Sequence, residues 1–237
     1  MKALFQGFRK RLDGVPPLIL SLLVISVVGM NLLANKSINT GLSWLALDGG
    51  ILFSWLTFLS LDVLTHWGGP RTATAASFAA LMGNLLMALL FFIASLIPGI
   101  WSESFVEGSE GIINQALNKT FGGTWYIILG SSVAFIIAAL VNNFLNHGIG
   151  RKMHFKEGFS VFALRAYIST FVAQLTDNMV FALIVSRVFF GWSLLQCFTC
   201  ALTGAVLELL FEIFFSPLGY RLLKRMNHNK AEAIKGA

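Results

Sequence analysis

The sequence predicts an all-α membrane protein with six transmembrane helices and both termini in the cytoplasm. Three observations lead to this fold class: an apolar composition, six long apolar runs, and basic residues concentrated in alternate connecting segments. Of the 237 residues, 56% are hydrophobic and only 12% are charged, whereas a typical soluble domain has about 25% charged residues. With a mean hydropathy of +0.75, a chain of this length cannot hide its apolar side chains in a water-soluble core.

Six apolar runs approach the length of roughly 20 residues that a spanning helix needs. They predict helices at about 18–35, 48–66, 72–97, 123–145, 161–190 and 193–225, within a single membrane domain over residues 1–237. Pro16 and Pro17 suit the start of the first helix. No small-residue cleavage site follows that helix, so we interpret it as a retained span rather than a cleaved signal peptide.

The placement of charge predicts the orientation. Basic residues occur at the N-terminus, after the second and fourth helices and in the C-terminal tail: Lys2, Arg9, Lys10, Arg11, Arg71, Arg151, Lys152, Lys156, Arg221, Lys224, Arg225, Lys230 and Lys235. The long segment after the third helix carries Glu103, Glu107 and Glu110 against Lys119. Because Lys and Arg accumulate on the cytoplasmic side, the net charge of +6 indicates topology rather than a nucleic-acid surface.

Polar and ionisable side chains within the apolar runs form three clusters. An ionisable group at bilayer depth costs about 2.5–3.5 kcal/mol on insertion scales, so each one requires an explanation. The clusters are Asp62 with His66; Arg165, Ser169, Thr170, Gln174, Asp177 and Asn178; and Cys200, Gly204, Glu208, Glu212 and Ser216. Within each cluster, spacings of three and four place the side chains on one helix face.

Each cluster has a structural and a functional interpretation. Single amides, such as Asn31, are more often hydrogen bonds between helices than ligands, and the glutamates could form a buried pair with Arg165. A whole stripe with Asp177 in its middle cannot face lipid, and this favours a shared solute chamber. Glu208 and Glu212 lie one turn apart, so one of them takes a proton or finds a cation.

Signals for an enzyme are missing from the sequence. It has no His-Glu-x-x-His helix, no Gly-x-Ser-x-Gly elbow and no phosphate-binding loop. Cys197 and Cys200 have a metal-like spacing but lie in a predicted membrane helix without a second pair, which is typical of packing cysteines. We therefore expect no enzymatic activity, no metal site and no cofactor.

Three stretches resemble the queuosine precursor transporter family, also called the putative vitamin uptake transporter family. They are residues 50–71 with Asp62 and His66, residues 165–178 with the Ser-Thr, Gln and Asp positions, and residues 208–220 with a terminal Pro and aromatic residue. Two positions differ from the family pattern. His66 stands where an acidic residue is usual, and Glu208 and Glu212 occupy a region in which a lysine is frequent.

The resemblance implies a multi-pass importer in the bacterial inner membrane for a 7-deazaguanine queuosine precursor or queuine. A carboxylate can accept the two adjacent N–H groups of a guanine-like edge, amides or Arg can donate to its carbonyl, and an aromatic ring can stack on the base. Asp177 or Glu208 is expected to bind the donor edge. The substrate-binding candidates are Asp177, Gln174, Asn178, Glu208, Glu212, Arg165, Asp62, Thr170, Asn31 and Trp55, with Phe171 and Phe181 as further stacking residues.

Alternatives differ in class. The chain could instead be the substrate-binding S-component of an energy-coupling-factor importer, driven by a separate ATPase module, for which the small residues of 75–80 offer a docking face. An intramembrane enzyme with an aspartyl dyad of Asp62 and Asp177, or a sensor, is a third class. The expected partners are the lipid bilayer and a purine-like solute, not nucleic acid. Assembly into a homo-oligomer is a further possibility. A proton gradient could drive uptake through a carboxylate that exchanges a proton.

Overall fold

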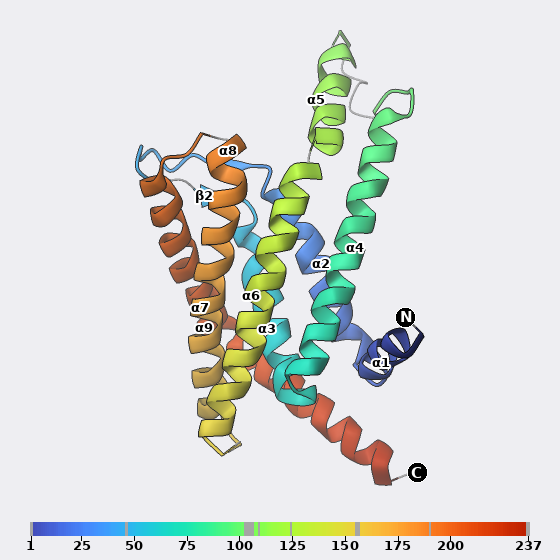
Figure 1. Cartoon of the computed structure of the whole chain (residues 1–237), viewed down its shortest axis with the longest axis vertical. Coiled ribbons are helices and arrows are strands. Elements are labelled where there is room, and N and C mark those ends of the chain that lie inside the picture. Colours follow the sequence, from blue (N-terminus) through green and yellow to red (C-terminus); the bar gives the residue numbers. More distant parts are fainter. Residues whose placement is uncertain are drawn as a thin grey trace.

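The computed structural model describes residues 2–45, 47–101, 107–108, 110–123, 125–154, 157–189 and 191–235. Long helices run along one axis and form a bundle with a small hairpin at one end (Figure 1). The elements are α1 (Lys2–Leu12), α2 (Pro17–Leu33), β1 (Ser37–Ile38), β2 (Leu47–Asp48), α3 (Ile51–Gly68), α4 (Pro70–Leu96), α5 (Glu110–Gly123), α6 (Trp125–Lys152), α7 (Phe159–Phe181), η2 (Ala182–Ser186), α8 (Arg187–Phe189) and α9 (Leu194–Lys235). Glu103 and Lys156, two residues of the charge argument, lie outside the described residues.

The described helices confirm an all-α membrane protein but identify fewer spans than six. By length and composition, four helical stretches could cross a membrane: Pro70–Leu96, Gly111–Lys152, Phe159–Phe189 and Leu194–Asn229. A fifth is added if Gln6–Leu12 and Pro17–Leu33, which meet at 109°, form one bent span. At 1.5 Å per residue, the 17 residues of α2 and the 18 of α3 reach about 26 and 27 Å, slightly less than the hydrocarbon thickness of about 30 Å.

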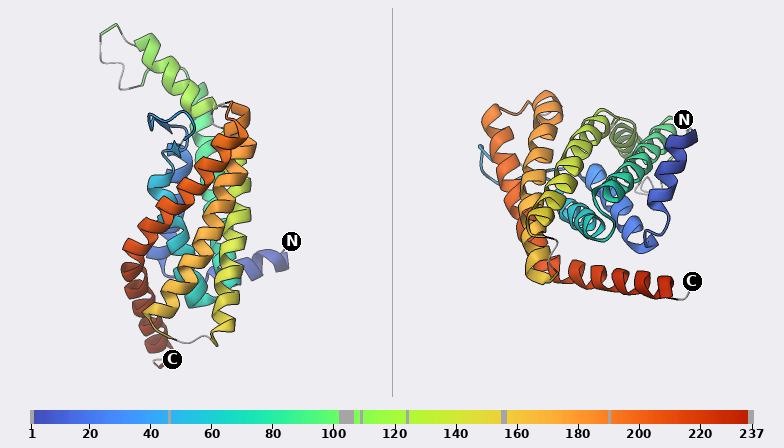
Figure 2. Two further views of the ribbon diagram at one scale, coloured as in Figure 1. Left: turned by 90° about the vertical axis from the view of Figure 1, so that its left-hand side faces the viewer. Right: turned by 60° about the horizontal axis from the view of Figure 1, so that its bottom comes forward.

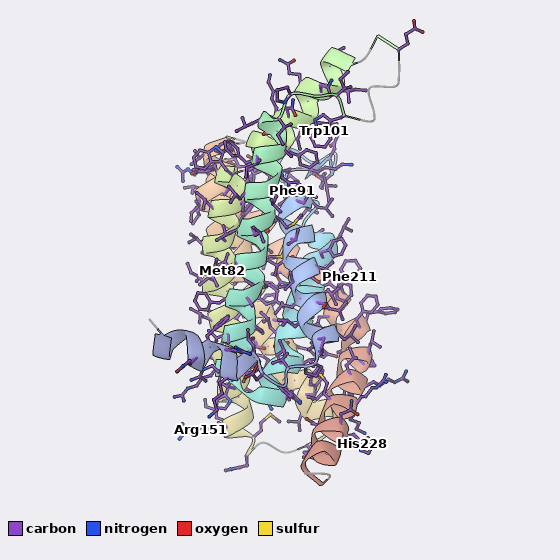
Figure 3. The ribbon with its side chains drawn as sticks, turned by 90° about the vertical axis from the view of Figure 1, so that its right-hand side faces the viewer. Met82, Phe91, Trp101, Arg151, Phe211 and His228 are labelled. Atoms are coloured by element: carbon purple, nitrogen blue, oxygen red, sulfur yellow. The ribbon has the colours of Figure 1, made fainter. Side chains whose placement is uncertain are left out.

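The outer surface of the bundle is apolar. On α4, Met82 and Leu96 are exposed by more than half, and on α9 Phe214 is 76% exposed. Figure 3 shows Met82 and Phe211 on the flanks of the bundle and Arg151 and His228 near one end. An apolar surface this extensive would be a liability in water, and it fits a lipid environment.

The helix α3 occupies the centre of the bundle. It packs against α2, α4, α6, α7 and α9, and every residue from Phe58 to Thr65 is buried. Its polar side chains, Asp62 among them, therefore face other helices and not lipid. This position explains how a short helix with an acidic residue is accommodated.

Three elements were not predicted from the sequence: α1, α5 and the hairpin β1–β2. In α1, Phe8 and Leu12 are half-buried while Arg9, Lys10 and Arg11 are exposed, a pattern that suits a helix lying at a membrane surface. Figure 2 shows α1 at the side of the bundle, at a steep angle to the long helices, and the turn to α2 contains Gly14 at a φ of +85°. This amphipathic helix is too short and too charged to register as an apolar run.

Helix α5 lies in the segment that the sequence predicts as a loop. Asn114 Oδ1 accepts the backbone N–H of Trp101 at 2.7 Å, and Asn118 Oδ1 accepts its indole N–H at 2.9 Å. The ring of Phe121 packs against Phe91 and Trp101 with centroids 5.0 and 5.2 Å apart. These contacts dock α5 on the end of α4, and they depend on pairings that single-sequence patterns do not reveal.

The hairpin β1–β2 lies at the same end of the bundle as α5 (Figure 1). Its two short strands pair antiparallel, with Ser37 opposite Asp48 and Ile38 opposite Leu47. The intervening loop is attached to the start of α9, where Gln196 Nε2 donates to the carbonyl of Ser43 at 3.0 Å and Thr199 Oγ1 donates to that of Trp44 at 2.7 Å. The hairpin therefore covers one end of the space between α2, α3, α7 and α9.

Candidate solute-binding site

A pocket with about 480 Å³ of empty space lies beneath the hairpin. We call it the hairpin pocket. Its lining comes from α2, β2, α3, α6, α7 and α9: Met30, Asn31, Ala34, Leu47, Asp48, Gly50, Ile51, Ser54, Ser131, Asp177, Asn178, Phe181, Cys200, Gly204 and Glu208. The 480 Å³ includes space open to solvent, and the enclosed space is about 40 Å³. A solute of the size of a purine needs more room, so binding requires the lining side chains to move apart.

Three carboxylates give the hairpin pocket its chemical character. Glu208 accepts hydrogen bonds from the hydroxyl of Ser54 and, at 3.2 Å, from Nδ2 of Asn178. Asp177 Oδ1 is buried and accepts no hydrogen bond from any described residue. Asp48 is close enough for its charge to act on both of the other carboxylates. No lysine or arginine is among the described lining residues, so the pocket favours a cationic or donor-rich solute.

Amides and one aromatic ring complete the wall. Asn31 donates through Nδ2 to the carbonyl of Val27 at 2.8 Å, and its Oδ1 accepts the hydroxyl of Ser131. Phe181 lines the pocket and is 8% exposed. A planar solute could therefore lie against an aromatic face while its polar edge contacts carboxylates and amides.

The pKa of Asp48 lies close to physiological pH. Asp48 lies on β2, outside the membrane-spanning helices, and burial raises its pKa to about 6, although the N–H of Gly50 at 2.7 Å counteracts the shift. The ionised form prevails above about pH 6. Asp48 thus adds negative charge to the hairpin pocket at neutral pH and loses that charge in mildly acidic conditions.

We predict that affinity for a cationic solute falls as the pH is lowered through about 6. The loss attributable to Asp48 should be up to about fivefold, because a partly exposed ion pair contributes up to ~1 kcal/mol. Binding isotherms of a cationic heterocycle, taken across this pH range for the wild type and Asp48→Asn, measure it. Superimposable pH curves for the two proteins would contradict a role for Asp48.

A second group of polar residues, the central cluster, lies one to two helical turns deeper. It consists of Asp62, Asn142, Asn146, Arg165, Ser169, Thr170, Gln174 and Glu212. All eight are buried. Asp62 Oδ1 accepts Nδ2 of Asn142 at 2.7 Å, Nδ2 of Asn146 at 2.9 Å and the Ser169 hydroxyl at 3.3 Å, and Oδ2 accepts the Thr170 hydroxyl at 3.0 Å.

The arginine of the second sequence cluster belongs to this cluster. Arg165 Nε donates to the carbonyl of Asn146 at 3.1 Å, and a terminal nitrogen donates to its side-chain oxygen at 2.8 Å. Since Asn146 also binds Asp62, the amide bridges the guanidinium to the carboxylate. Arg165 also lines an open pocket of about 860 Å³ with His66, Phe162 and Lys224. We call it the basic-end pocket.

The structure separates the predicted site residues into two places. Asp177, Asn178, Glu208 and Asn31 line the hairpin pocket, whereas Asp62, Arg165, Thr170, Gln174 and Glu212 lie in the central cluster. Trp55 lies in neither, because its ring stacks on Phe215 at 4.2 Å and on Phe211 at 6.2 Å. Of the three aromatic residues predicted as stacking candidates, Phe181 is the one that lines the hairpin pocket.

The sequence did not single out several residues that line the pocket. Asp48 lies in a connecting segment, and Ser54 and Ser131 are hydroxyls of a kind that is common in membrane helices. The two serines matter because Ser54 donates to Glu208 and Ser131 donates to Asn31. Cys197 and Cys200 are free and buried. No group of three or more His, Cys, Asp or Glu side chains in the described residues could hold a metal ion.

A glycine on α9 provides a test of the Asn178–Glu208 contact. A Cβ at Gly204 would lie 2.7 Å from Nδ2 of Asn178, so Gly204→Ala should displace that amide and break its bond to Glu208. We expect solute affinity to fall about tenfold, as for the loss of one hydrogen bond to a charged group. Gly148→Ala is the control, because nothing lies within 4 Å of a Cβ there, and binding equal to the wild type in both variants would contradict the prediction.

Comparison with known proteins gives one match. A family model described as "Putative vitamin uptake transporter" matches residues 48–222. This range includes the central cluster and the hairpin pocket apart from Met30, Asn31, Ala34 and Leu47. Neither the curated proteins nor the solved structures contain a match to the chain.

Proposed function

The chain belongs to the putative vitamin uptake transporter family, and from this membership we propose that it imports a small heterocyclic solute, a 7-deazaguanine queuosine precursor or queuine. The proposal concerns the substrate and the direction of transport. Membership itself, together with the apolar helices, makes the chain a multi-pass membrane protein of a transporter family. A transporter family is consistent with the absence of enzymatic activity.

The orientation that we propose places the hairpin outside the cell and both termini in the cytoplasm. The exposed basic residues Arg9, Arg71, Arg151 and Arg221 lie on α1, the start of α4, the end of α6 and the second half of α9, which gather at one end of the bundle (Figure 1). This is the distribution expected for a cytoplasmic face. With α2, α3, α4, α6, α7–α8 and α9 as spans, the chain crosses a bacterial inner membrane six times.

The chemistry of the hairpin pocket supports a guanine-like solute. In the proposed complex, Asp177 Oδ1 and Glu208 accept the adjacent N–H groups of the base, and Asn178 pairs with its carbonyl edge. Phe181 packs against the ring plane. An amine on the solute would be attracted by the three carboxylates, of which Asp48 lies on the hairpin itself.

One observation carries this proposal. Asp177 Oδ1 is a buried oxygen without a hydrogen-bond donor among the described residues, and it faces a pocket with no lysine or arginine among its described lining residues. A buried acceptor without a donor is costly, so the site is organised for a donor that arrives with the solute.

Direct binding to the purified protein tests the proposal. Radiolabelled queuine and an amine-bearing 7-deazaguanine should bind and should compete with each other, while adenine, which lacks the guanine pattern of donors, should not displace them. Failure of both 7-deazaguanines to bind, or equal displacement by adenine, would exclude the proposed substrate class.

The alternative is an S-component that requires an ATPase module, and its predicted docking face consists of Ala75, Ala76, Ser77, Ala79 and Ala80. Four of these residues are between 0 and 4% exposed, and Ala79 is half-buried. Their burial in helix packing argues against a partner on this face of α4. Uptake by the purified protein alone in proteoliposomes is therefore expected, and dependence on a co-purifying ATPase would favour the alternative.

A further inference from the structure

The deeper pair of carboxylates, Asp62 and Glu212, is not needed to line the hairpin pocket. Asp62 is saturated with donors, because two amides and two hydroxyls contact its oxygens at 2.7–3.3 Å. A carboxylate that accepts this many hydrogen bonds is stabilised in its ionised form. These four donors favour the ionised form of Asp62 over that of a carboxyl without donors.

Glu212 has the opposite environment. Both of its oxygens are buried and accept no hydrogen bond from any residue in the described part of the chain. Its carboxyl lies close enough to Asp62 and to the Thr170 hydroxyl for both groups to act on it. Two ionised carboxylates cannot lie against each other in an interior of low polarity. A proton on Glu212 resolves the conflict, because the acid can then donate to Asp62.

We propose that Glu212, paired with Asp62, is the proton-binding site that couples solute uptake to a proton gradient. This inference depends on the proposed function and assigns its energy coupling to a site separate from the hairpin pocket. In one cycle the Glu212 carboxylate takes a proton from water on the hairpin side and later releases it to water on the basic side. One proton thus enters with each solute molecule, and no other bond is made or broken.

The central cluster has polar connections in both directions. Toward the hairpin pocket, Asn178 contacts Glu208 and Thr170 lies by Glu212. Gln174, which is one turn from each on α7, therefore faces the space between the two glutamates. Its amide nitrogen and oxygen are both buried and have no hydrogen-bond partner among the described residues. Such a side chain suits contact with a passing solute or water.

Toward the other side, the basic-end pocket brings solvent to the edge of the cluster. It reaches Arg165 and His66, and His66 Nδ1 lies 3.1 Å from the carbonyl of Asp62. The charge of Asp62 acts on Arg165. Release of the proton on this side would leave the carboxylates of Asp62 and Glu212 beside the single guanidinium of Arg165. The excess negative charge would favour return of the empty transporter to the state in which Glu212 can take a proton from the hairpin side.

The helices packed around Glu212 carry several titratable or charged groups. They are Asp62 and His66 on α3, Arg165, Tyr167 and Asp177 on α7, and Glu208 on α9 itself. Of this set, Asp62 is the group whose charge acts on Glu212, so Glu212→Gln removes one proton site while the others stay in place.

Proteoliposomes with the membrane potential clamped to zero provide the test. With a one-unit pH difference, acidic outside, the wild type should accumulate the labelled amine-bearing 7-deazaguanine about tenfold at one proton per solute, and an internal pH dye should report acidification. Glu212→Gln should lose accumulation and acidification, yet still exchange labelled for unlabelled solute. Glu107→Gln, an exposed position on the segment before α5, is the matched control and should match the wild type.

The outcomes separate the two proposals. If the wild type binds solute but accumulates it equally without a pH difference, or responds to a sodium gradient instead, the proton site is excluded while the proposed function survives. Infrared spectroscopy adds a readout that needs no solute. The carbonyl absorption of buried protonated carboxyls should lose one component in Glu212→Gln, and that same component should shift in Asp62→Asn. A spectrum in this region that is unchanged in Glu212→Gln would overturn the assignment even if no solute bound.

Discussion

Replacement of Asp62 by alanine should destabilise the folded protein strongly, because this carboxylate organises the central cluster. The substitution leaves the donors of Asn142, Asn146, Ser169 and Thr170 without their common acceptor, and each orphaned buried donor costs about 1–3 kcal/mol. It also removes the anion whose charge acts on Arg165. Because such losses are not additive, we expect a decrease of about 3–5 kcal/mol, the range for breaking a buried charge pair.

The buried cysteines provide a convenient measurement. Cys197 and Cys200 are free and buried, so a thiol-reactive dye reports unfolding of the detergent-solubilised protein on heating. Asp62→Asn should be destabilised less than Asp62→Ala, because one side-chain oxygen remains to accept part of the donor set. Ser169→Ala, which removes the longest contact at 3.3 Å, should have the smallest effect. Equal melting temperatures for Asp62→Ala and the wild type would show that the cluster is not organised around this carboxylate.

The polar stripes could be predicted from the sequence because helical spacing is a local property. Thr170, Gln174 and Asp177 share a face of α7, and Glu208 and Glu212 share a face of α9, as spacings of three and four require. The all-α class and the membrane environment followed from composition and apolar runs, and the family followed from the resemblance of three stretches to known members. The division of these stripes into a pocket and a deeper cluster could not be predicted, since it depends on how the two antiparallel helices are aligned.

The features that the sequence missed depend on contacts between distant segments. Asp48 is unremarkable in sequence and becomes part of the pocket because the hairpin pairs Ser37 with Asp48 and its loop is held by α9. Trp55 looked suitable for stacking on a base, but its position on α3 turns the indole toward Phe215. Its indole N–H donates to the carbonyl of Leu52 at 2.9 Å, one turn back on the same helix.

Glu208→Gln is expected to reduce solute affinity about 100-fold, the largest loss of binding expected from a single change in the hairpin pocket. The exchange keeps the shape of the side chain but removes its charge, and it forces an amide against the Asn178 amide and the Ser54 hydroxyl, both of which now donate to Glu208. Loss of one member of a buried, hydrogen-bonded charge contact typically costs about 2–5 kcal/mol, and the lower part of that range corresponds to this loss. Equilibrium binding of the labelled 7-deazaguanines to purified protein measures it, with Glu107→Gln as the matched control.

Two ligands that differ in charge distinguish how Glu208 acts. If its charge attracts the solute, Glu208→Gln should weaken an amine-bearing 7-deazaguanine more than a neutral one of the same shape. If its oxygens bind the N–H edge of the base, both ligands should lose the same factor, and Asp177→Asn should behave in the same way because Asp177 Oδ1 faces the same space. Undiminished affinity in both variants would move the solute out of the hairpin pocket, since no other described lining residue except Asp48 carries a negative charge there. A pocket whose carboxylates could be neutralised without effect would have no physical reason to keep three of them together beneath one hairpin.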